Sequence, residues 1–136
     1  MSAPLFNRLA LIGTGLIGSS IARAARAQGA VRSIVATARS AQTRKRVAEL
    51  GLADQVVETN VAAVEGADLI ILCIPVGACG EVAKEIGHRL APGAIVSDVG
   101  SVKGAVVREM APHLPKAAHF VPAHPVAGTE YSGPDA

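Results

Sequence analysis

Aromatic residues are almost absent from this sequence. They make up 2% of its 136 residues, with no tryptophan, one tyrosine and two phenylalanines, whereas 50% of the residues are hydrophobic. A chain of this length can bury the core of one domain. That core must therefore consist of alanine, valine, isoleucine and leucine, whose small side chains allow helices to pack closely on a sheet.

Cysteine, surplus charge and long apolar runs are scarce as well. Cys73 and Cys79 form no metal-ligand pattern, so no metal is expected, and this usage fits a reducing, cytoplasmic location. The net charge of +2 is small, and the basic residues are scattered apart from a cluster within 39–46. No run approaches the ~20 apolar residues that span a bilayer. We therefore expect neither nucleic acid nor a membrane as a partner.

The N-terminal apolar stretch has some features of a secretory signal, because Arg8 precedes it and the small-residue run ARAARA follows it. However, the stretch contains three glycines at a meaningful spacing, and Ser19 and Ser20 interrupt it. We therefore interpret it as part of the folded domain.

Apolar runs and amphipathic segments alternate along the whole chain, with glycine or proline between them. The third apolar run, DLIILCI, has no polar residue after its first position, as expected for a strand that is covered on both faces. Strands are predicted at 9–12, 33–37, 68–74, 94–99 and 118–121, and helices at 16–28, 42–50, 76–90 and 103–114. This order predicts an α/β fold with a doubly wound parallel sheet and helices on both faces.

The first strand leads into the motif Gly13-x-Gly15-x-x-Gly18, and the predicted helix follows at once. In this context the first glycine allows a tight turn, the second lets the backbone approach a pyrophosphate, and the third lets the helix pack on the sheet. The amides near Leu16 and Ile17 then direct the helix N-terminus at the phosphates. The motif predicts a Rossmann-type dinucleotide site, although a tight turn alone would use the same glycines.

The residues after the second strand bear on the choice of cofactor. A site that selects NAD usually has a carboxylate there, which accepts a hydrogen bond from the ribose 2′-hydroxyl. This chain has Thr37, Arg39 and Ser40 at that place and no carboxylate. Arg39 and Ser40 are suited to a 2′-phosphate, with Arg44 or Lys45 nearby, so we favour NADP over NAD. The alternative is that these residues form a solvated basic helix face.

Ligands of a doubly wound sheet bind beyond the carboxyl ends of its strands. Ile74, Pro75 and Val76 follow the third predicted strand and should border the cofactor. Ser101 follows the fourth predicted strand, and His124, which is framed by prolines, follows the fifth. The two side chains should meet at one rim, where a histidine can act as a general base near neutral pH.

Structural roles compete with catalytic ones at this rim. Ser101 is equally suited to cap the helix that begins near Lys103. A solvated position in the first helical turn explains Lys103 better than a catalytic role does. Asp98, at a strand end, is better suited to brace the turn that follows it than to act as an acid.

Four segments together resemble one known family. GTGLIGSSIARA, ADLIILCIPVGA, SDVGSVKGAVV and HPVAGTEYSGPDA are similar to the prephenate/arogenate (cyclohexadienyl) dehydrogenases of tyrosine biosynthesis. The glycine motif is common to many dehydrogenases, whereas GSVKG combined with HPVAGTE is much more specific. The resemblance runs along nearly the whole chain.

The resemblance implies an oxidative decarboxylation that uses NAD or NADP. Prephenate would give 4-hydroxyphenylpyruvate, or arogenate would give tyrosine, with the release of carbon dioxide. The family histidine that hydrogen-bonds the ring hydroxyl and assists its deprotonation corresponds to His124. The family serine that contacts the hydroxyl and the nicotinamide region corresponds to Ser101. Thr129 would lie at the substrate site, and Glu130 would help to shape it.

The resemblance also has consequences for domain organisation. Family members continue into a C-terminal helical domain that forms a homodimer and completes the substrate pocket. We therefore expect residues 1–136 to be the dinucleotide-binding domain of a longer protein, and this piece alone to catalyse little. Two alternatives remain: another NADP-dependent dehydrogenase, acting for example on a hydroxy acid, and a nucleotide-sensing module without redox chemistry.

Overall fold

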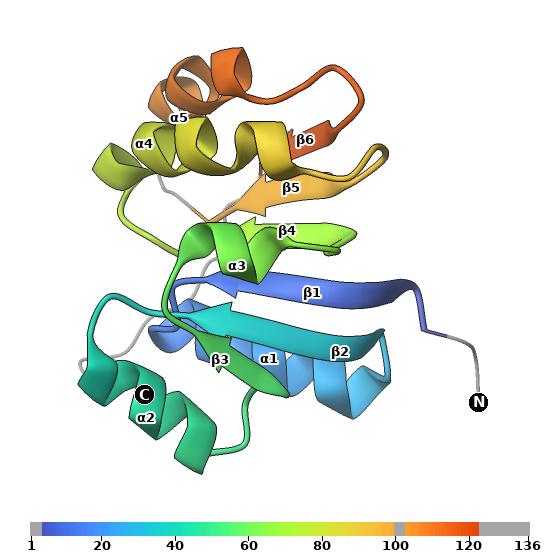
Figure 1. Ribbon diagram of the computed structural model, residues 1–136, viewed down its shortest axis with the longest axis vertical. Helices are drawn as coiled ribbons and strands as arrows, with labels where there is room; N and C mark the ends of the chain where they lie inside the picture. The colour runs from blue at the N-terminus through green and yellow to red at the C-terminus, as the bar shows by residue number, and fades with distance from the viewer. Residues whose placement is uncertain (1–3, 100–102, 123–136) are drawn as a thin grey trace.

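The computed structural model describes residues 4–99 and 103–122 of the chain. They form a six-stranded, entirely parallel sheet with helices on both faces (Figure 1). The strands are β1 (Phe6–Ile12), β2 (Val31–Thr37), β3 (Gln55–Val57), β4 (Leu69–Leu72), β5 (Ile95–Asp98) and β6 (His119–Pro122). The helices are α1 (Leu16–Gln28), α2 (Ala41–Glu49), α3 (Asn60–Val64), α4 (Val76–Ile86) and α5 (Lys103–Met110), with 3-10 turns at Gly87–Arg89 and Ala111–His113.

The strand order across the sheet is β3-β2-β1-β4-β5-β6. The chain first winds outwards from β1 to β3 and then crosses back to β4, beside β1 on its other flank. This order is that of the doubly wound dinucleotide-binding fold, whose ligands bind where the winding direction reverses. The predicted fold class is therefore confirmed, and the reversal lies between β1 and β4.

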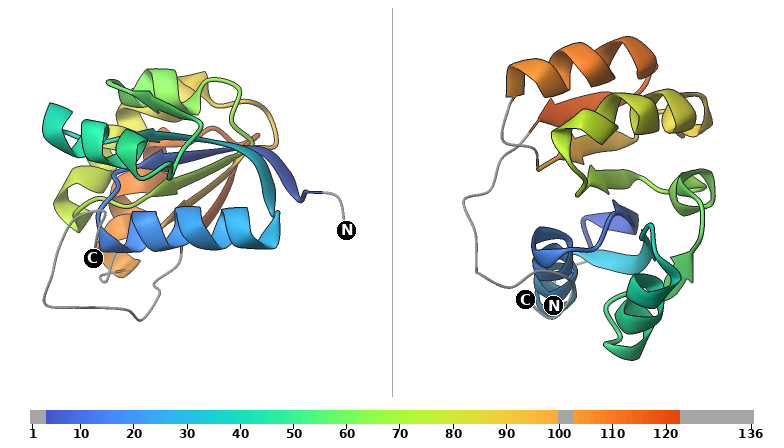
Figure 2. Two further views of the ribbon diagram at one scale, coloured as in Figure 1. Left: turned by 90° about the horizontal axis from the view of Figure 1, so that it is seen from below. Right: turned by 90° about the vertical axis from the view of Figure 1, so that its left-hand side faces the viewer.

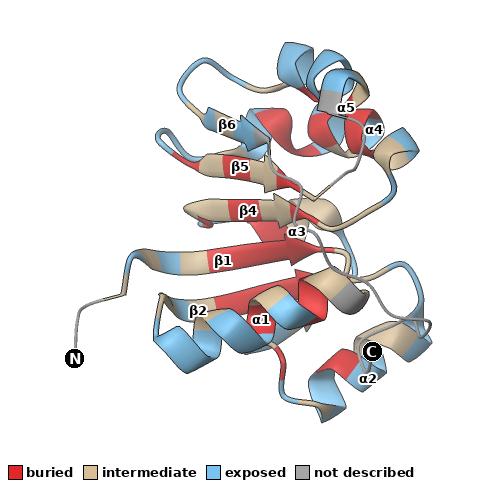
Figure 3. Ribbon diagram, turned by 180° about the vertical axis from the view of Figure 1, so that it is seen from behind, coloured by how far each residue is buried: buried red, intermediate tan, exposed pale blue. Residues whose placement is uncertain are grey.

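Alternate residues of β1 face two separate hydrophobic cores. Leu9 and Leu11 belong to a core that includes Ala22 of α1 and Val47 of α2. The other core contains Ala10 and Ile12 of β1, together with buried residues of α3, α4 and α5. Figures 2 and 3 show these helices on the faces of the sheet and the buried residues concentrated in the central strands. The predicted core of small aliphatic side chains is what the fold contains, since no aromatic ring is fully buried in the described residues.

Two elements were not predicted from the sequence. β3 has only three residues, begins with an exposed glutamine and is held by parallel pairing with the end of β2. Helix α3 follows it with five residues, and Thr59 caps this helix by accepting a hydrogen bond from the amide of Ala62 at 3.2 Å. Neither element is long enough to show a periodic pattern of hydrophobic residues, so no strand or helix was predicted within residues 51–67.

Two predicted helices end earlier than expected. α4 stops at Ile86 and α5 at Met110, and each continues into a 3-10 turn. The two turns pack against each other at buried Gly87, where a Cβ would collide with the backbone carbonyl of His113. In the described part of the chain, no helix is long and apolar enough to cross a membrane.

Candidate functional site

The first glycine of the motif follows β1 and contacts the ends of β2 and β4, where the winding direction of the sheet reverses. Gly13 has a φ of +91°, which favours glycine, and its amide donates to the carbonyl oxygen of Thr37 at 3.0 Å. A Cβ at this position would run into the backbone carbonyl of Cys73 and lie 2.9 Å from Cγ2 of Ile74. The turn after β1 is thus packed directly against the segment that follows β4.

The other two glycines face different surroundings. A Cβ on Gly18 would lie 2.7 Å from the carbonyl oxygen of Gly13, so a side chain there would push α1 away from the turn. A Cβ on Gly15 would have no atom of the described residues within 4 Å. Gly15 is also the N-cap of α1 and offers no side-chain cap, so the first helical amides can take an external anion. Packing therefore requires Gly18, whereas the space at Gly15 is left open.

A buried hydroxyl without a partner lies between these glycines. Thr14 is 4% exposed, and its Oγ1 atom makes no hydrogen bond within residues 4–99 and 103–122. The neighbouring hydroxyl of Ser19 is satisfied, because it donates to the carbonyl oxygen of Gly15 at 2.7 Å. An orphaned buried hydroxyl costs free energy, because it has given up its hydrogen bonds to water without a replacement.

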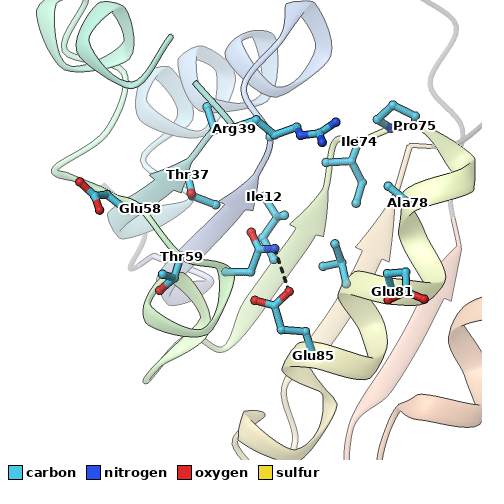
Figure 4. Close-up of a pocket in the computed structure, with 14 residues that line it drawn as sticks. Ile12, Thr37, Arg39, Glu58, Thr59, Ile74, Pro75, Ala78, Glu81 and Glu85 are labelled. Carbon is cyan, nitrogen blue, oxygen red and sulfur yellow. Dashed lines mark hydrogen bonds between the residues drawn. The ribbon is translucent and has the colours of Figure 1, made fainter. Parts of the chain in front are cut away.

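A cleft of about 470 Å³ opens beside the glycine turn (Figure 4). Its apolar wall comes from the strand ends, the segment after β4 and the first turns of α4, and comprises Ile12, Ile74, Pro75, Ala78 and Val82. Its polar lining comes from the end of β2 and the residues after it, from the stretch between β3 and the start of α3, and from α4. It comprises Thr37, Arg39, Glu58, Thr59, Asn60, Glu81 and Glu85. The cleft therefore combines an apolar wall with side chains of both charges, as small-molecule and cofactor sites commonly do.

Only one side chain of the basic cluster lines this cleft. Arg39 extends across it towards Ile74 and Pro75 (Figure 4). Arg44 instead donates to the carbonyl oxygen of Ala38 at 2.8 Å, and Lys45 lies 4.0 Å from Glu49 on the outer face of α2. Arg44 also donates to the carbonyl oxygen of Arg39 at 3.2 Å, so it lies beside Arg39 as expected, although its guanidinium does not line the cleft. A role for Arg44 or Lys45 at a 2′-phosphate stays a prediction.

Ser40 lies next to Arg39 and caps α2. Its Oγ accepts a hydrogen bond from the amide of Thr43 at 3.1 Å and donates to Oγ1 of Thr43 at 2.8 Å. The sequence raised a solvated helix face as the alternative to a phosphate site, and the cap explains why a serine stands here in either case.

Cys73 and Asp98 lie at the strand ends near the glycine turn. Burial raises the pKa of the Cys73 thiol to about 12, and the carboxylate of Asp98 adds to the rise. The thiol therefore stays protonated at neutral pH and packs as an apolar group. Asp98 is fully buried at the end of β5. Among the described residues, no group of histidine, cysteine and carboxylate side chains is placed to hold a metal ion.

The predicted catalytic and substrate-binding residues are Ser101, His124, Thr129 and Glu130, and all four lie outside the described residues. The strands that precede them are described: β5 and β6 are parallel neighbours with Asp98 opposite Pro122. Both strands therefore end at the same edge of the sheet as β1 and the glycine turn.

Several residues of the cleft were not predicted from the sequence. Val82 lies one helical turn after Ala78, which ends the segment CIPVGA expected to border the cofactor, so the pattern of α4 could have indicated Val82. Glu58 and Asn60 gave no such signal, because they are positioned by the unpredicted β3. Of the residues that the sequence predicted for the cofactor, Gly13, Thr37, Arg39, Ile74 and Pro75 line the cleft, whereas the lining after β3 became visible only in the fold.

Comparison with known proteins agrees with this geometry. The family model for "Prephenate dehydrogenase, nucleotide-binding domain" matches residues 21–136. The chain belongs to the prephenate dehydrogenase family. A cyclohexadienyl dehydrogenase of Zymomonas mobilis is 43% identical over 133 residues, which cover 97% of this chain and 45% of that protein.

Solved structures of this dehydrogenase family superpose closely on the fold. Prephenate dehydrogenase from Aquifex aeolicus, in complex with hydroxyphenyl propionate and NAD+, has a TM-score of 0.85 and 33% identity, covering 95% of this chain and 45% of that one. Arogenate dehydrogenase from Synechocystis has a TM-score of 0.83 and 30% identity, covering 94% and 44%. The chain thus spans less than half the length of these relatives.

Proposed function

We propose that this chain is the NAD(P)-binding part of a prephenate or arogenate dehydrogenase. The observation that carries the proposal is the glycine turn: Gly13 and Gly18 are packed tight, whereas Gly15 faces open space at the start of a helix. That combination leaves room for a pyrophosphate where the helix amides point. The homodimer and the C-terminal domain that the family resemblance implies belong to the same proposal.

The residues of the site fit a dinucleotide. The amides of Leu16 and Ile17, in the first turn of α1, would hold the pyrophosphate, and the unpartnered hydroxyl of Thr14 lies in the same turn. The adenosine half would enter the cleft, with its base between the apolar wall and the segment after β2. The adjoining residues proposed to contact it are Thr37, Arg39, Ser40, Ile74, Pro75 and Val76.

The reaction would remove a hydride and carbon dioxide from a cyclohexadiene ring. The hydrogen on the hydroxyl-bearing carbon leaves as hydride, the ring carboxylate leaves as carbon dioxide, and the freed electron pair makes the ring aromatic. A bound nicotinamide supplies the acceptor of the hydride. Because aromatisation drives the reaction, the protein mainly has to orient the substrate and assist one proton.

This chain would supply the groups that act on the ring hydroxyl. His124 would accept a hydrogen bond from that hydroxyl and assist its deprotonation, and Ser101 would hold the same hydroxyl in place. Thr129 and Glu130 would line the substrate site. What supports these roles is the family resemblance of the segments GSVKG and HPVAGTE, together with the shared edge at which β5 and β6 end.

We further propose that the cofactor is NADP rather than NAD. Arg39 is the cation on the described lining of the cleft, and no carboxylate follows β2 within 37–40. A 2′-phosphate next to Arg39 would also meet the N-terminus of α2. The Ser40 oxygen would still cap the helix, and its hydroxyl proton would turn from Oγ1 of Thr43 to the phosphate.

The experiment is calorimetric titration of the chain with NADP+ and, separately, with NAD+. We expect NADP+ to bind more tightly, and Arg39→Asp to reverse this order, because a carboxylate repels the 2′-phosphate and accepts from a free 2′-hydroxyl. Binding of NAD+ with equal or higher affinity would refute the NADP proposal alone. If neither dinucleotide bound, the proposed function itself would be refuted for this chain.

A further inference from the structure

One end of the cleft is closed by a hydrogen-bonded pair from two different elements. Nδ2 of Asn60, the first residue of α3, donates to Oε2 of Glu85 in α4 at 3.3 Å (Figure 4). Both residues line the cleft, and the side chain of Glu85 is exposed and therefore reachable by a ligand. The amide holds one carboxylate oxygen, so the orientation of the carboxylate is set before any ligand enters.

Charge is distributed unequally along the described lining of the cleft. Arg39 lies at the end near Pro75, and Glu85 lies at the opposite end (Figure 4). Glu58 and Glu81 add further carboxylates to the lining. A phosphate is attracted to the arginine end and repelled from the carboxylate end. The carboxylate end therefore suits a neutral group that donates hydrogen bonds.

The chemistry of this pair is specific. An ionised carboxylate only accepts hydrogen bonds, whereas the Asn60 amide can both donate and accept. Adenine presents an exocyclic amine, which donates, next to ring nitrogens, which accept. Hypoxanthine has an oxygen in place of that amine and a proton on the neighbouring N1. In the pose that adenine takes, its oxygen would face the carboxylate with no proton between them. The pair thus matches the amino edge of adenine and opposes a 6-oxo purine.

We propose that Glu85, oriented by Asn60, accepts a hydrogen bond from the exocyclic amine of the adenine base. This hydrogen bond makes the cleft selective for adenine dinucleotides. This inference rests on the proposed function, because it assumes that a dinucleotide occupies the cleft. The proposal also fixes how the adenosine half is oriented in the cleft. Its ribose lies near Arg39, and its base extends along the apolar wall towards α3.

The test is calorimetric titration of the chain with NADP+ and with its hypoxanthine analogue, in which an oxygen replaces the 6-amine of the base and N1 carries a proton. We expect the wild-type chain to bind NADP+ about tenfold more tightly, the value of one hydrogen bond to a charged acceptor at an exposed site. Glu85→Gln should reduce this ratio to within about twofold, because an amide can turn its NH2 group towards the 6-oxo oxygen.

Glu81→Gln is the matched control, since it makes the same charge change one turn earlier on α4, in the same cleft. It should leave the ratio near its wild-type value. The inference is wrong if the wild-type chain binds both dinucleotides equally, if Glu85→Gln keeps the wild-type ratio, or if Glu81→Gln lowers it as much. Binding of neither dinucleotide would instead refute the proposed function, so the two failures are distinct.

Discussion

The three glycines of the turn after β1 are required for different physical reasons. Gly13 needs a positive φ and close contact with Cys73, and Gly18 needs contact with the Gly13 carbonyl. Gly15 has an extended backbone that other residues adopt, and free space around it. Among the described residues, therefore, no packing contact requires a glycine at position 15, whereas the proposed pyrophosphate would.

Alanine substitutions should separate these two roles. Gly15→Ala should leave the melting temperature within about 2 °C of wild type, because no atom obstructs the methyl group, yet weaken NADP+ binding at least about tenfold. Gly18→Ala should lower the stability by about 1–3 kcal/mol, because the backbone must move to admit the methyl group. Thermal unfolding and calorimetric titration of both variants check this, and equal losses of stability would contradict it.

The unpartnered hydroxyl of Thr14 should weaken the free chain. Thr14→Val replaces it by a methyl group of similar size and removes a desolvation cost of about 1–3 kcal/mol, so the melting temperature without ligand should rise. The control is Ser19→Ala, which removes a satisfied hydroxyl in the next turn and should lower the melting temperature. A lower melting temperature for Thr14→Val would show that this hydroxyl has a partner.

At the scale of elements, Asp54 connects α1 to the strand beside it. Its Oδ2 accepts a hydrogen bond from the amide of Ile34 in β2 at 2.7 Å and lies 3.2 Å from Nη2 of Arg26 in α1. The hydrogen bond from Ile34, helped by Arg26 and opposed by partial burial, lowers the pKa of Asp54 below its usual value. The charged form is therefore the one that fits the fold.

This lowered pKa predicts a loss of stability in acid. The carboxylate contributes its stabilisation above about pH 4, its unfolded pKa, and loses it as the pH falls through the lower folded pKa. Asp54→Asn should therefore reduce stability at pH 7 and flatten the decline below about pH 4. Urea unfolding at several pH values measures this, with exposed Glu65→Gln as the control for removal of one negative charge. An unchanged acid slope in Asp54→Asn would refute the assignment.

At the scale of the whole molecule, the cleft lies where the two halves of the sheet meet. Its lining comes from β1 and the segments after β2 and β3 on one side, and from the segment after β4 and α4 on the other. A ligand there contacts both halves of the winding at once. It binds the folded chain only, because unfolding separates these segments.

Ligand binding should therefore stabilise the chain as a unit. NADP+ at about one hundred times its dissociation constant should add about 2.7 kcal/mol and raise the melting temperature by roughly 8 °C. Nicotinamide mononucleotide at the same concentration lacks the adenosine half and should raise it much less. A fluorescence-monitored melt measures both shifts. Equal shifts would show that the cleft does not hold the adenosine half.

Much of the fold and part of the site were predictable from the sequence. The apolar run DLIILCI, the Gly13-x-Gly15-x-x-Gly18 turn and the helix beginning at residue 16 are local patterns, since the residues that specify them are neighbours in the chain. Local spacing was therefore enough to place β1, α1, β2 and β4 and to point to a dinucleotide site. The roles of Ser101 and His124 stay predictions.

The opposite wall of the cleft depended on tertiary structure. β3 is a strand only because it pairs with β2, and that pairing places Glu58 and Asn60 at the cleft. Asn60 meets Glu85 across 25 residues of chain, and no local pattern records such a contact. Likewise, the sequence does not distinguish the two arginines. Only the fold shows that Arg39 lines the cleft, whereas Arg44 donates a hydrogen bond to the backbone carbonyl of Ala38. The sequence by itself determined where the chain turns to accept phosphate, because a turn is specified by adjacent residues. The tertiary structure decided what surrounds the base, because that wall is assembled from distant segments.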